Sequence, residues 1–150
     1  MAFGFGARTN QRQREDALRS ALRIDGHHLR RVLERSVPRK TAAGEVIVHQ
    51  GDPADALYVI VTGKFEVTVP LADGTRRVVR MLGAGTTFGE IAVLDGAPRN
   101  ADVTSSIDGE VLVLSSKDLR YALDDAKPAR DELEAEAAER KAQLARSACR

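Results

Sequence analysis

One stretch of the sequence combines residue types that can bind an anion. It runs from Phe88 to Ala101 and reads FGEIAVLDGAPRNA. Gly89 lets the backbone approach a ligand closely, and the first N–H groups of a helical turn through Ile91 and Ala92 would point outward as anion donors. Arg99 adds a planar, permanently charged guanidinium whose geometry matches phosphate oxygens. The chemistry that this stretch suggests is therefore phosphate binding.

Glu90 lies in the same turn and extends this chemistry to hydroxyl groups. Its ionised carboxylate only accepts hydrogen bonds, so it would be poorly placed beside an anion unless it met hydroxyls instead. A phosphate with a neighbouring hydroxyl describes a ribose phosphate. Taken alone, each residue is better explained as surface structure: Gly89 as a turn glycine, Arg99 as a surface charge and Glu90 as its exposed partner. The functional interpretation rests on their order and spacing.

The segments around this stretch indicate a small β-rich fold. Between Gly44 and Leu114, short β-branched runs alternate with turn signals that contain Gly and Asp. This rhythm predicts a barrel or a roll. The runs are Glu45 to His49, Leu57 to Val61, Lys64 to Val69, Arg76 to Met81 and Glu110 to Leu114.

Helices are predicted on both sides of the β region. Apolar residues recur at helical spacing from Ala17, with a break at Asp25-Gly26, which predicts two short helices before Pro38. After the β region, Ser116 is the candidate N-cap of a helix from Lys117 to Asp124.

A longer last helix is predicted to begin near Pro128 and to run toward Ser147. Its apolar stripe is thin, because only Leu133, Ala137 and Leu144 form it among many charged residues. So little apolar surface predicts weak docking, and a weakly docked helix next to a pocket can act as a lid. A solvated terminal helix explains the same pattern equally well, and the sequence leaves both interpretations open.

Length and composition limit the domain organisation and the function classes. The 150 residues fit one domain. We expect a flexible N-terminal segment over residues 1–16 and one domain over residues 17–150, with a helical lead-in (17–38), a β-roll (40–115) and C-terminal helices (116–147). Lysine and arginine total 23 against 22 acidic residues, and a net charge of +1 provides no field for gripping nucleic acid. We therefore expect no nucleic-acid partner.

The sequence also argues against membrane insertion, metal binding and catalysis. No apolar run approaches the roughly 20 residues of a membrane-spanning helix, so we expect no membrane insertion and a cytoplasmic location. The histidines His27, His28 and His49 show no pattern of converging metal ligands, and nothing links Cys149 to a catalytic base. We expect no metal site, no cofactor and no catalytic residues, and hence a protein that is not an enzyme.

Further motifs precede the Phe88-Gly89-Glu90 turn. In order, the sequence contains Ala43-Gly44-Glu45-Val46-Ile47, Gln50-Gly51-Asp52, Asp55, Leu57-Tyr58-Val59-Ile60, Gly63, Leu82-Gly83-Ala84-Gly85 and Phe88-Gly89-Glu90. This combination resembles the signature of the cyclic-nucleotide-binding domain family, which includes the regulatory subunit of cAMP-dependent protein kinase, bacterial catabolite-activator regulators and nucleotide-gated channels. The resemblance covers roughly Leu18 to Leu144. It implies a mainly β fold with flanking helices (α+β), namely an antiparallel, jelly-roll-like double-stranded β-roll with N-terminal helices and a C-terminal lid helix.

The resemblance also implies a phosphate-binding cassette with defined roles. Glu90 would accept the ribose 2′-hydroxyl, and Arg99 would pair with the cyclic phosphate. The backbones of Gly89 and Ala92 would hold sugar and phosphate oxygens. The expected ligand-binding residues are Phe88, Gly89, Glu90, Ile91, Ala92, Arg99, Asn100 and Ala101.

Asn100 departs from the family pattern. It stands with Ala101 on the phosphate side, where alanine, serine or threonine is usual, so the family's cue for cAMP against cGMP cannot be read. The expectation of cAMP, with cGMP left open, rests on its frequency in the family.

The function implied is a cyclic-nucleotide sensor that signals through movement of its C-terminal helix. Its effector would be a protein partner acting in trans, or a second copy in a homodimer. The alternative is a ligand-free scaffold that keeps the fold and serves as a protein–protein interaction module. Asn100 and the expected lack of an output domain favour the scaffold, whereas Gly89, Glu90 and Arg99 favour the sensor.

Overall fold

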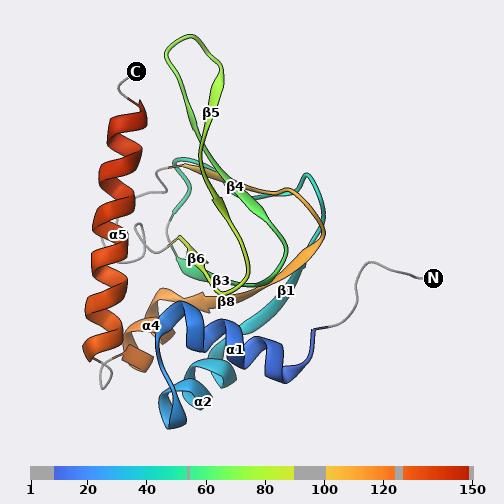
Figure 1. The fold of residues 1–150 in the computed structure, drawn as a ribbon, viewed down its shortest axis with the longest axis vertical. Helices are drawn as coiled ribbons and strands as arrows, with labels where there is room; N and C mark the ends of the chain where they lie inside the picture. Colours follow the sequence, from blue (N-terminus) through green and yellow to red (C-terminus); the bar gives the residue numbers. More distant parts are fainter. Residues whose placement is uncertain (1–8, 54, 90–100, 124–126, 149–150) are drawn as a thin grey trace, which may run out of the picture.

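The structure is a computed structural model that describes residues 9–53, 55–89, 101–123 and 127–148. Its strands form two antiparallel sheets that face each other as a roll, with helices packed against the roll from two sides (Figure 1). One sheet has the order β1 (Val37–Thr41), β8 (Gly109–Ser115), β3 (Ala56–Thr62) and β6 (Thr87–Phe88). The other has the order β2 (Val46–Val48), β7 (Asp102–Ser105), β4 (Phe65–Pro70) and β5 (Arg76–Leu82). The helices are α1 (Gln11–Leu22), α2 (Gly26–Arg35), α4 (Ser116–Leu123) and α5 (Lys127–Ala148). The predicted β-roll, preceded and followed in the sequence by helices, is confirmed.

Helix α1 begins earlier than the apolar spacing predicted. Asn10 caps it: the Asn10 Oδ1 accepts the Gln13 N–H at 2.9 Å, and the Gln13 Oε1 accepts the Asn10 N–H at 2.9 Å. Residues 11–16, which we expected to be flexible, therefore lie in the helix. The prediction started at Ala17 because every residue from 11 to 16 is polar and adds nothing to an apolar period.

The N-cap of helix α4 is also one residue away from its predicted place. The Ser115 Oγ accepts the Asp118 N–H at 3.1 Å and donates to the Asp118 carboxylate at 3.0 Å. Ser116 is the first helical residue and not the cap. The side chain that ends β8 thus starts the next helix, so there is no loop between them.

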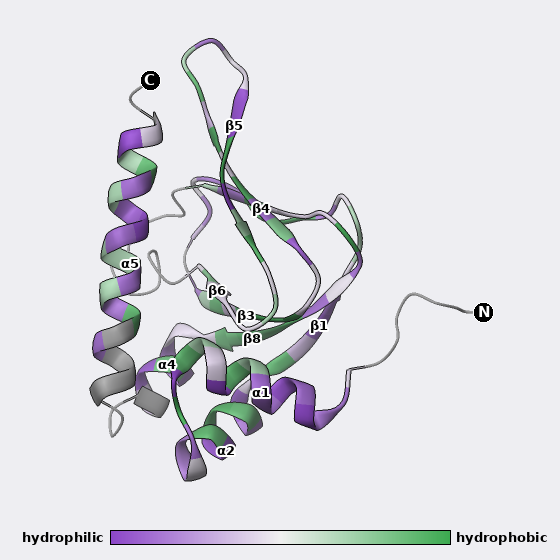
Figure 2. Cartoon of the chain, in the orientation of Figure 1, coloured by the Kyte–Doolittle hydropathy of each residue, from purple (hydrophilic) through white to green (hydrophobic). Residues whose placement is uncertain are grey.

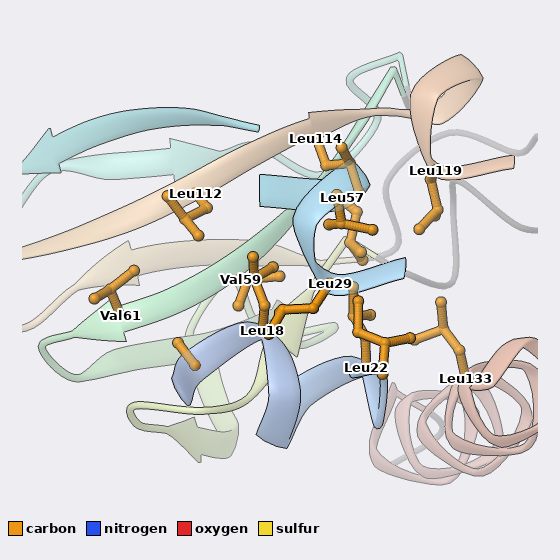
Figure 3. Packing of buried hydrophobic residues seen from close by; sticks show 13 residues of the cluster. Leu18, Leu22, Leu29, Leu57, Val59, Val61, Leu112, Leu114, Leu119 and Leu133 are labelled. Carbon is orange, nitrogen blue, oxygen red and sulfur yellow. The ribbon is translucent and has the colours of Figure 1, made fainter. Parts of the chain in front are cut away.

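Two apolar clusters stabilise the fold, one on each face of the β1-β8-β3-β6 sheet. The first lies between this sheet and the helices, and its leucines converge from both layers (Figure 3). Its members include Leu18, Leu22, Leu29, Val32, Leu57, Val59, Leu112, Leu114, Leu119 and Leu133. The second cluster lies between the two sheets and comprises Ile47, Val48, Ile60, Phe65, Leu82, Phe88, Val103 and Val111. Alternation along β3 places Val59 in the first cluster and Ile60 in the second, as strand geometry requires.

The hydropathy of the helices follows their burial. Figure 2 shows hydrophobic residues gathered on α2 and on the strands beneath the helices, whereas α5 is hydrophilic over much of its length. Among the α5 residues whose burial the structure describes, Leu133 and Ala137 are buried, at 2% and 6% exposure, and Leu144 is half-buried. The thin apolar stripe predicted for this helix is therefore present.

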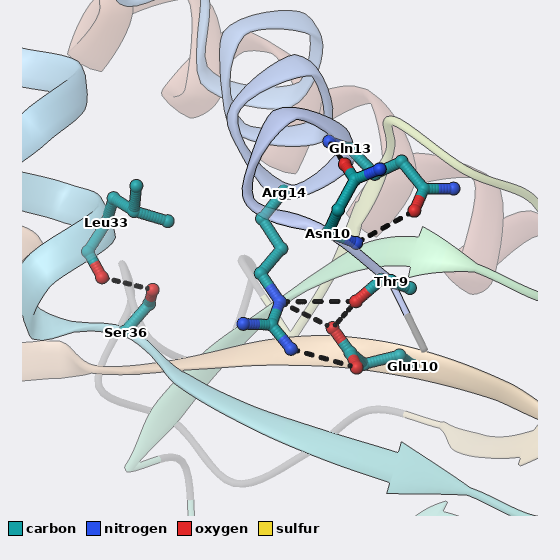
Figure 4. Close-up of polar contacts among 7 residues, drawn as sticks. All are labelled: Thr9, Asn10, Gln13, Arg14, Leu33, Ser36 and Glu110. Atoms are coloured by element: carbon teal, nitrogen blue, oxygen red, sulfur yellow. Dashed lines mark hydrogen bonds and ion pairs between the residues drawn. The ribbon is translucent and has the colours of Figure 1, made fainter. Parts of the chain in front are cut away.

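A buried charged network ties the start of the chain to the roll (Figure 4). Glu110, on β8, is only 5% exposed. Its carboxylate accepts hydrogen bonds from the Arg14 Nε at 2.9 Å, the Arg14 Nη2 at 3.3 Å and the Thr9 hydroxyl at 2.5 Å. Because a buried carboxylate is costly without partners, this network fixes α1 on the sheet.

Replacing Arg14 with alanine should lower the free energy of unfolding by about 1–3 kcal/mol, because it leaves the Glu110 carboxylate buried with a single donor. Urea unfolding followed by circular dichroism measures this loss. Arg12→Ala is the matched control, since Arg12 is exposed on the same helix and should change stability by less than about 0.5 kcal/mol. Equal losses in the two variants would contradict a structural role for the network.

Candidate functional site

The structure describes only the two ends of the predicted binding segment. Phe88, Gly89 and Ala101 lie in the described part of the chain. Glu90, Ile91, Ala92, Arg99 and Asn100 lie outside the described residues. The described geometry is therefore that of two anchors, one at each end of the segment.

The first anchor is β6, the strand that ends at Phe88. Its two residues pair antiparallel with β3, Thr87 opposite Val59 and Phe88 opposite Tyr58. The Phe88 ring is 2% exposed and stacks on the Tyr58 ring, with centroids 4.7 Å apart and planes 10° from parallel. The Phe65 ring also packs against the Phe88 ring, with centroids 5.4 Å apart and planes tilted by 39°. Three aromatic rings thus hold the chain in place immediately before Gly89.

Gly89 has a backbone conformation that favours glycine. Its φ is +88°, in the region that residues with a Cβ rarely adopt. The chain therefore turns sharply directly after Phe88. This agrees with the predicted turn at the head of the segment.

The loop before β6 is held by hydrogen bonds to β3. The Gly85 N–H donates to the Ile60 carbonyl at 2.9 Å, and the Ile60 N–H donates to the Thr86 carbonyl at 2.9 Å. Gly85 has a φ of +82°, and a Cβ placed there would lie 2.9 Å from the Ser20 Oγ of α1. Glycine suits this position because of its positive φ, and helix α1 also packs close to the loop.

The second anchor is the start of β7. Ala101 is 7% exposed, and Asp102 next to it bonds to two other parts of the roll. The Asp102 carboxylate accepts the Gln50 N–H at 2.6 Å and pairs with the Arg76 guanidinium at 2.7 Å. No pattern in the sequence indicates this role, because Gln50 and Arg76 are distant from Asp102 in the chain.

The two anchors belong to different sheets. Strand β6 pairs with β3, while β7 pairs with β2 and β4 in the facing sheet. The chain leaves one sheet after Phe88 and enters the other at Asp102. The predicted binding segment therefore joins the two sheets at one place on the roll.

Signature residues outside the segment hold turns. The Gly44 N–H donates to the Ser105 carbonyl at 2.7 Å, with a Gly44 φ of +86°. The Glu45 carboxylate accepts the Ala42 N–H at 3.0 Å and pairs with Arg39 at 2.7 Å. The Ala42 hydrogen bond, opposed by partial desolvation and assisted by Arg39, lowers the pKa of Glu45. These residues shape the roll and do not form a site of their own.

Helix α5 contacts the first anchor. The Arg140 Nη1 donates to the Thr87 carbonyl at 2.6 Å, and the Gln143 Nε2 donates to the Val79 carbonyl of β5 at 3.4 Å. The Arg80 guanidinium also donates to the Gln143 side chain. The sequence pattern predicted the apolar stripe of this helix but not these polar contacts.

Neither a metal-binding cluster nor a membrane-spanning helix is found within the described residues. No group of three or more His, Cys, Asp or Glu side chains there is arranged to hold a metal ion. No described helix combines the length and the hydropathy needed to cross a membrane.

Comparison with known proteins finds similar sequences and similar solved structures. The chain is 54% identical over 65 residues to the cAMP-dependent protein kinase regulatory subunit of Dictyostelium discoideum. This match covers 41% of this chain and 20% of that protein. Among solved structures, the regulatory domain of Toxoplasma gondii PKA in co-crystal with cAMP has a TM-score of 0.72 and 30% identity, covering 79% of this chain and 48% of that chain. The catabolite activator protein of Thermus thermophilus has a TM-score of 0.70 and 27% identity, covering 81% and 57%.

The family model for the cyclic nucleotide-binding domain matches residues 38–126. That range contains the strands from β2 to β8, both anchors and the segment between them. Because the match extends over more than half of the 150 residues and agrees with the fold, the chain belongs to the cyclic nucleotide-binding domain family.

Proposed function

We propose that this domain binds a cyclic nucleotide, with cAMP as the preferred ligand, in the segment between Phe88 and Ala101. The observation that carries the proposal is the pair of anchors: the segment that contains Gly89, Glu90 and Arg99 starts and ends on two rigid strands. Rigid flanks suit a binding loop because they reduce the entropy lost when the ligand orders it. The similarity to a PKA regulatory domain crystallised with cAMP supports this choice of ligand.

The roles of the residues follow the family resemblance. Arg99 pairs with the cyclic phosphate, and the Glu90 carboxylate accepts the ribose 2′-hydroxyl. The backbones of Gly89 and Ala92 hold sugar and phosphate oxygens, and the turn at Gly89 supports this role because it requires no Cβ near the ligand. Ile91, Asn100 and Ala101 complete the binding surface.

Signalling then runs through helix α5. Ligand binding orders the segment and biases the position of α5, which contacts the strand leading into it. The surface changed in this way acts on a protein effector or on a second copy of the chain.

The role of Glu90 predicts a difference between two ligands. Glu90→Gln should weaken cAMP binding by about tenfold, because a charged acceptor for the 2′-hydroxyl is lost. The same variant should bind 2′-deoxy-cAMP about as well as the unsubstituted protein does. Isothermal titration of both proteins with both ligands makes the comparison. Equal losses for cAMP and its deoxy analogue would refute the assignment of Glu90 to the ribose.

A further inference from the structure

The binding segment ends at the start of β7, a strand of only four residues, Asp102–Ser105. The ladder of β7 with β2 shifts between Val46 and Val48, so pairing on that side is irregular. A slip of one residue would turn every side chain of β7 to the opposite face of the sheet. Because a strand this short has few backbone hydrogen bonds with which to resist a slip, side-chain contacts that fix its register carry more weight.

The Asp102 carboxylate makes such contacts on the outer face of the sheet. Val103 lies in the cluster between the two sheets, so alternation directs Asp102 to the opposite face. One carboxylate oxygen accepts the Gln50 N–H at 2.6 Å, and the other pairs with the Arg76 guanidinium at 2.7 Å. The Nε of the same guanidinium donates to the Thr68 hydroxyl at 3.3 Å. We call Asp102, Arg76, Thr68 and the Gln50 N–H the outer clasp.

The outer clasp joins all the strands of the β2-β7-β4-β5 sheet. Thr68 lies on β4 directly opposite Asp102, Arg76 begins β5, and Gln50 follows β2 in the chain. Strands β4 and β5 form one hairpin (Figure 1), and Arg76 reaches from its loop end across Thr68 to the start of β7. Since Asp102 can meet these partners in one register only, a slip of β7 would break its contacts with both Gln50 and Arg76.

The loop that supplies the Gln50 N–H is itself held in a turn. The Asp52 carboxylate accepts the His49 N–H at 3.2 Å, and the Asp52 N–H donates to the His49 carbonyl at 3.1 Å. These two hydrogen bonds enclose Gln50. The turn therefore presents the Gln50 N–H to Asp102 from a fixed position, which lowers the entropy lost when the contact forms.

We propose that Asp102 is a positioning residue for the nucleotide site: by fixing the register of β7, it determines where the binding segment ends. Ala101, at the end of that segment, directly precedes Asp102 and is 7% exposed. A displaced β7 would move this end of the segment and leave the first anchor, which pairs with β3, in place. Neither Asp102 nor Arg76 belongs to the motifs that carry the family resemblance. The clasp stands on its contacts alone, whereas its effect on nucleotide rests on the proposed function.

The negative charge of Asp102 separates positioning from simple electrostatics. By charge alone, a carboxylate near the phosphate-binding residues repels an anionic ligand, so its removal should strengthen the binding of cAMP. A positioning role predicts the opposite, because loss of the clasp raises the conformational entropy that the ligand must remove. The direction of the change in affinity therefore distinguishes the two effects.

Amide exchange of the nucleotide-free full chain, measured residue by residue with NMR, tests the clasp itself. Asp102→Asn keeps an oxygen acceptor and removes the charge, and it should speed exchange of the Gln50 amide by about three- to tenfold. Asp108→Asn is the matched control, because the Asp108 carboxylate accepts the Ala43 N–H at 2.8 Å in the turn between β7 and β8. It should speed exchange at Ala43 and leave Gln50 unchanged. Equal exchange of Gln50 in the two variants would overturn the clasp.

Isothermal titration with cAMP then tests the positioning role. Asp102→Asn should weaken binding by about three- to tenfold, whereas Asp108→Asn should stay within about twofold of the unsubstituted protein. Arg76→Ala should weaken binding by about threefold, and Arg77→Ala, which removes the same charge from the next residue, should not. The double variant of Arg76→Ala and Asp102→Asn should bind about as tightly as Asp102→Asn alone, because the two side chains act through one contact.

Three results of the titration would overturn the positioning role. These are stronger or unchanged cAMP binding in Asp102→Asn, losses that add up in the double variant, and equal losses in Asp102→Asn and Asp108→Asn, which would indicate a general effect of instability. An absence of cAMP binding in every protein, the unsubstituted one included, would refute the proposed function and the positioning role with it. Exchange of the Gln50 amide in the free protein decides the clasp separately.

Discussion

Arg99→Ala should weaken cAMP binding by about tenfold to several hundredfold. The cyclic phosphate carries a full negative charge, and a guanidinium offers it two parallel, charge-assisted hydrogen bonds. Alanine removes both, and the backbone N–H groups that remain cannot replace a formal positive charge. The loss should appear in the affinity and not in the stability of the free protein, which urea unfolding measures on the same samples.

A matched variant separates this effect from a change in overall charge. Arg77→Ala removes one exposed arginine from β5, a strand that pairs with β4 and not with either anchor strand, and lowers the net charge by the same amount. It should leave the affinity for cAMP within about twofold of the original. If Arg99→Ala binds cAMP as tightly as Arg77→Ala does, the cassette has been assigned to the wrong residues.

Phe88→Ala should be the most destabilising of the proposed substitutions, with a loss of about 3–5 kcal/mol in the free energy of unfolding. The ring is almost fully buried between Tyr58 and Phe65, and its removal leaves a cavity between the two sheets. Because Phe88 also fixes the first anchor, the fraction that remains folded should bind cAMP more weakly. Urea unfolding and titration below the unfolding transition measure the two effects.

Leu112→Ala supplies the comparison for this second effect. Leu112 is fully buried in the cluster on the helical face of the sheet, and alanine there should cost about 2–5 kcal/mol. Leu112 lies on β8, whereas Phe88 is part of the first anchor, β6. The affinity of the folded fraction of Leu112→Ala should therefore be retained. Similar affinity losses in the two variants would show that instability, and not the position of the anchor, governs binding.

The sequence predicted the roll because its central strands are apolar and regularly spaced. Strands β3, β4 and β8 bury Leu57, Phe65 and Leu112 and stand out from the turns around them. Strands β1 and β6, the two edges of the β1-β8-β3-β6 sheet, were missed for physical reasons. Strand β1 lies at a sheet edge, begins with the exposed Val37 and contains a proline, so its pattern is not that of a buried strand. Strand β6 has two residues, too few to show any period.

The site residues that could be predicted from the sequence are those that lie together in one stretch of the chain. The order Gly89, Glu90 and Arg99 can be read from one stretch of sequence, as can the need for a turn at Gly89. The contacts that position this stretch cannot, because they join distant residues. Asp102 meets Gln50 and Arg76, and Thr87 meets Arg140, across pairs of strands and helices that only the fold brings together.

The most direct test of the account is isothermal titration of nucleotide-free protein with cAMP and, separately, with cGMP. Saturable binding near one nucleotide per chain is the expected result, with cAMP bound more tightly than cGMP. Tighter binding of cGMP would keep the site and reverse the choice of ligand. An absence of binding by either nucleotide to folded protein would contradict the account and favour a scaffold that has kept the fold without the ligand.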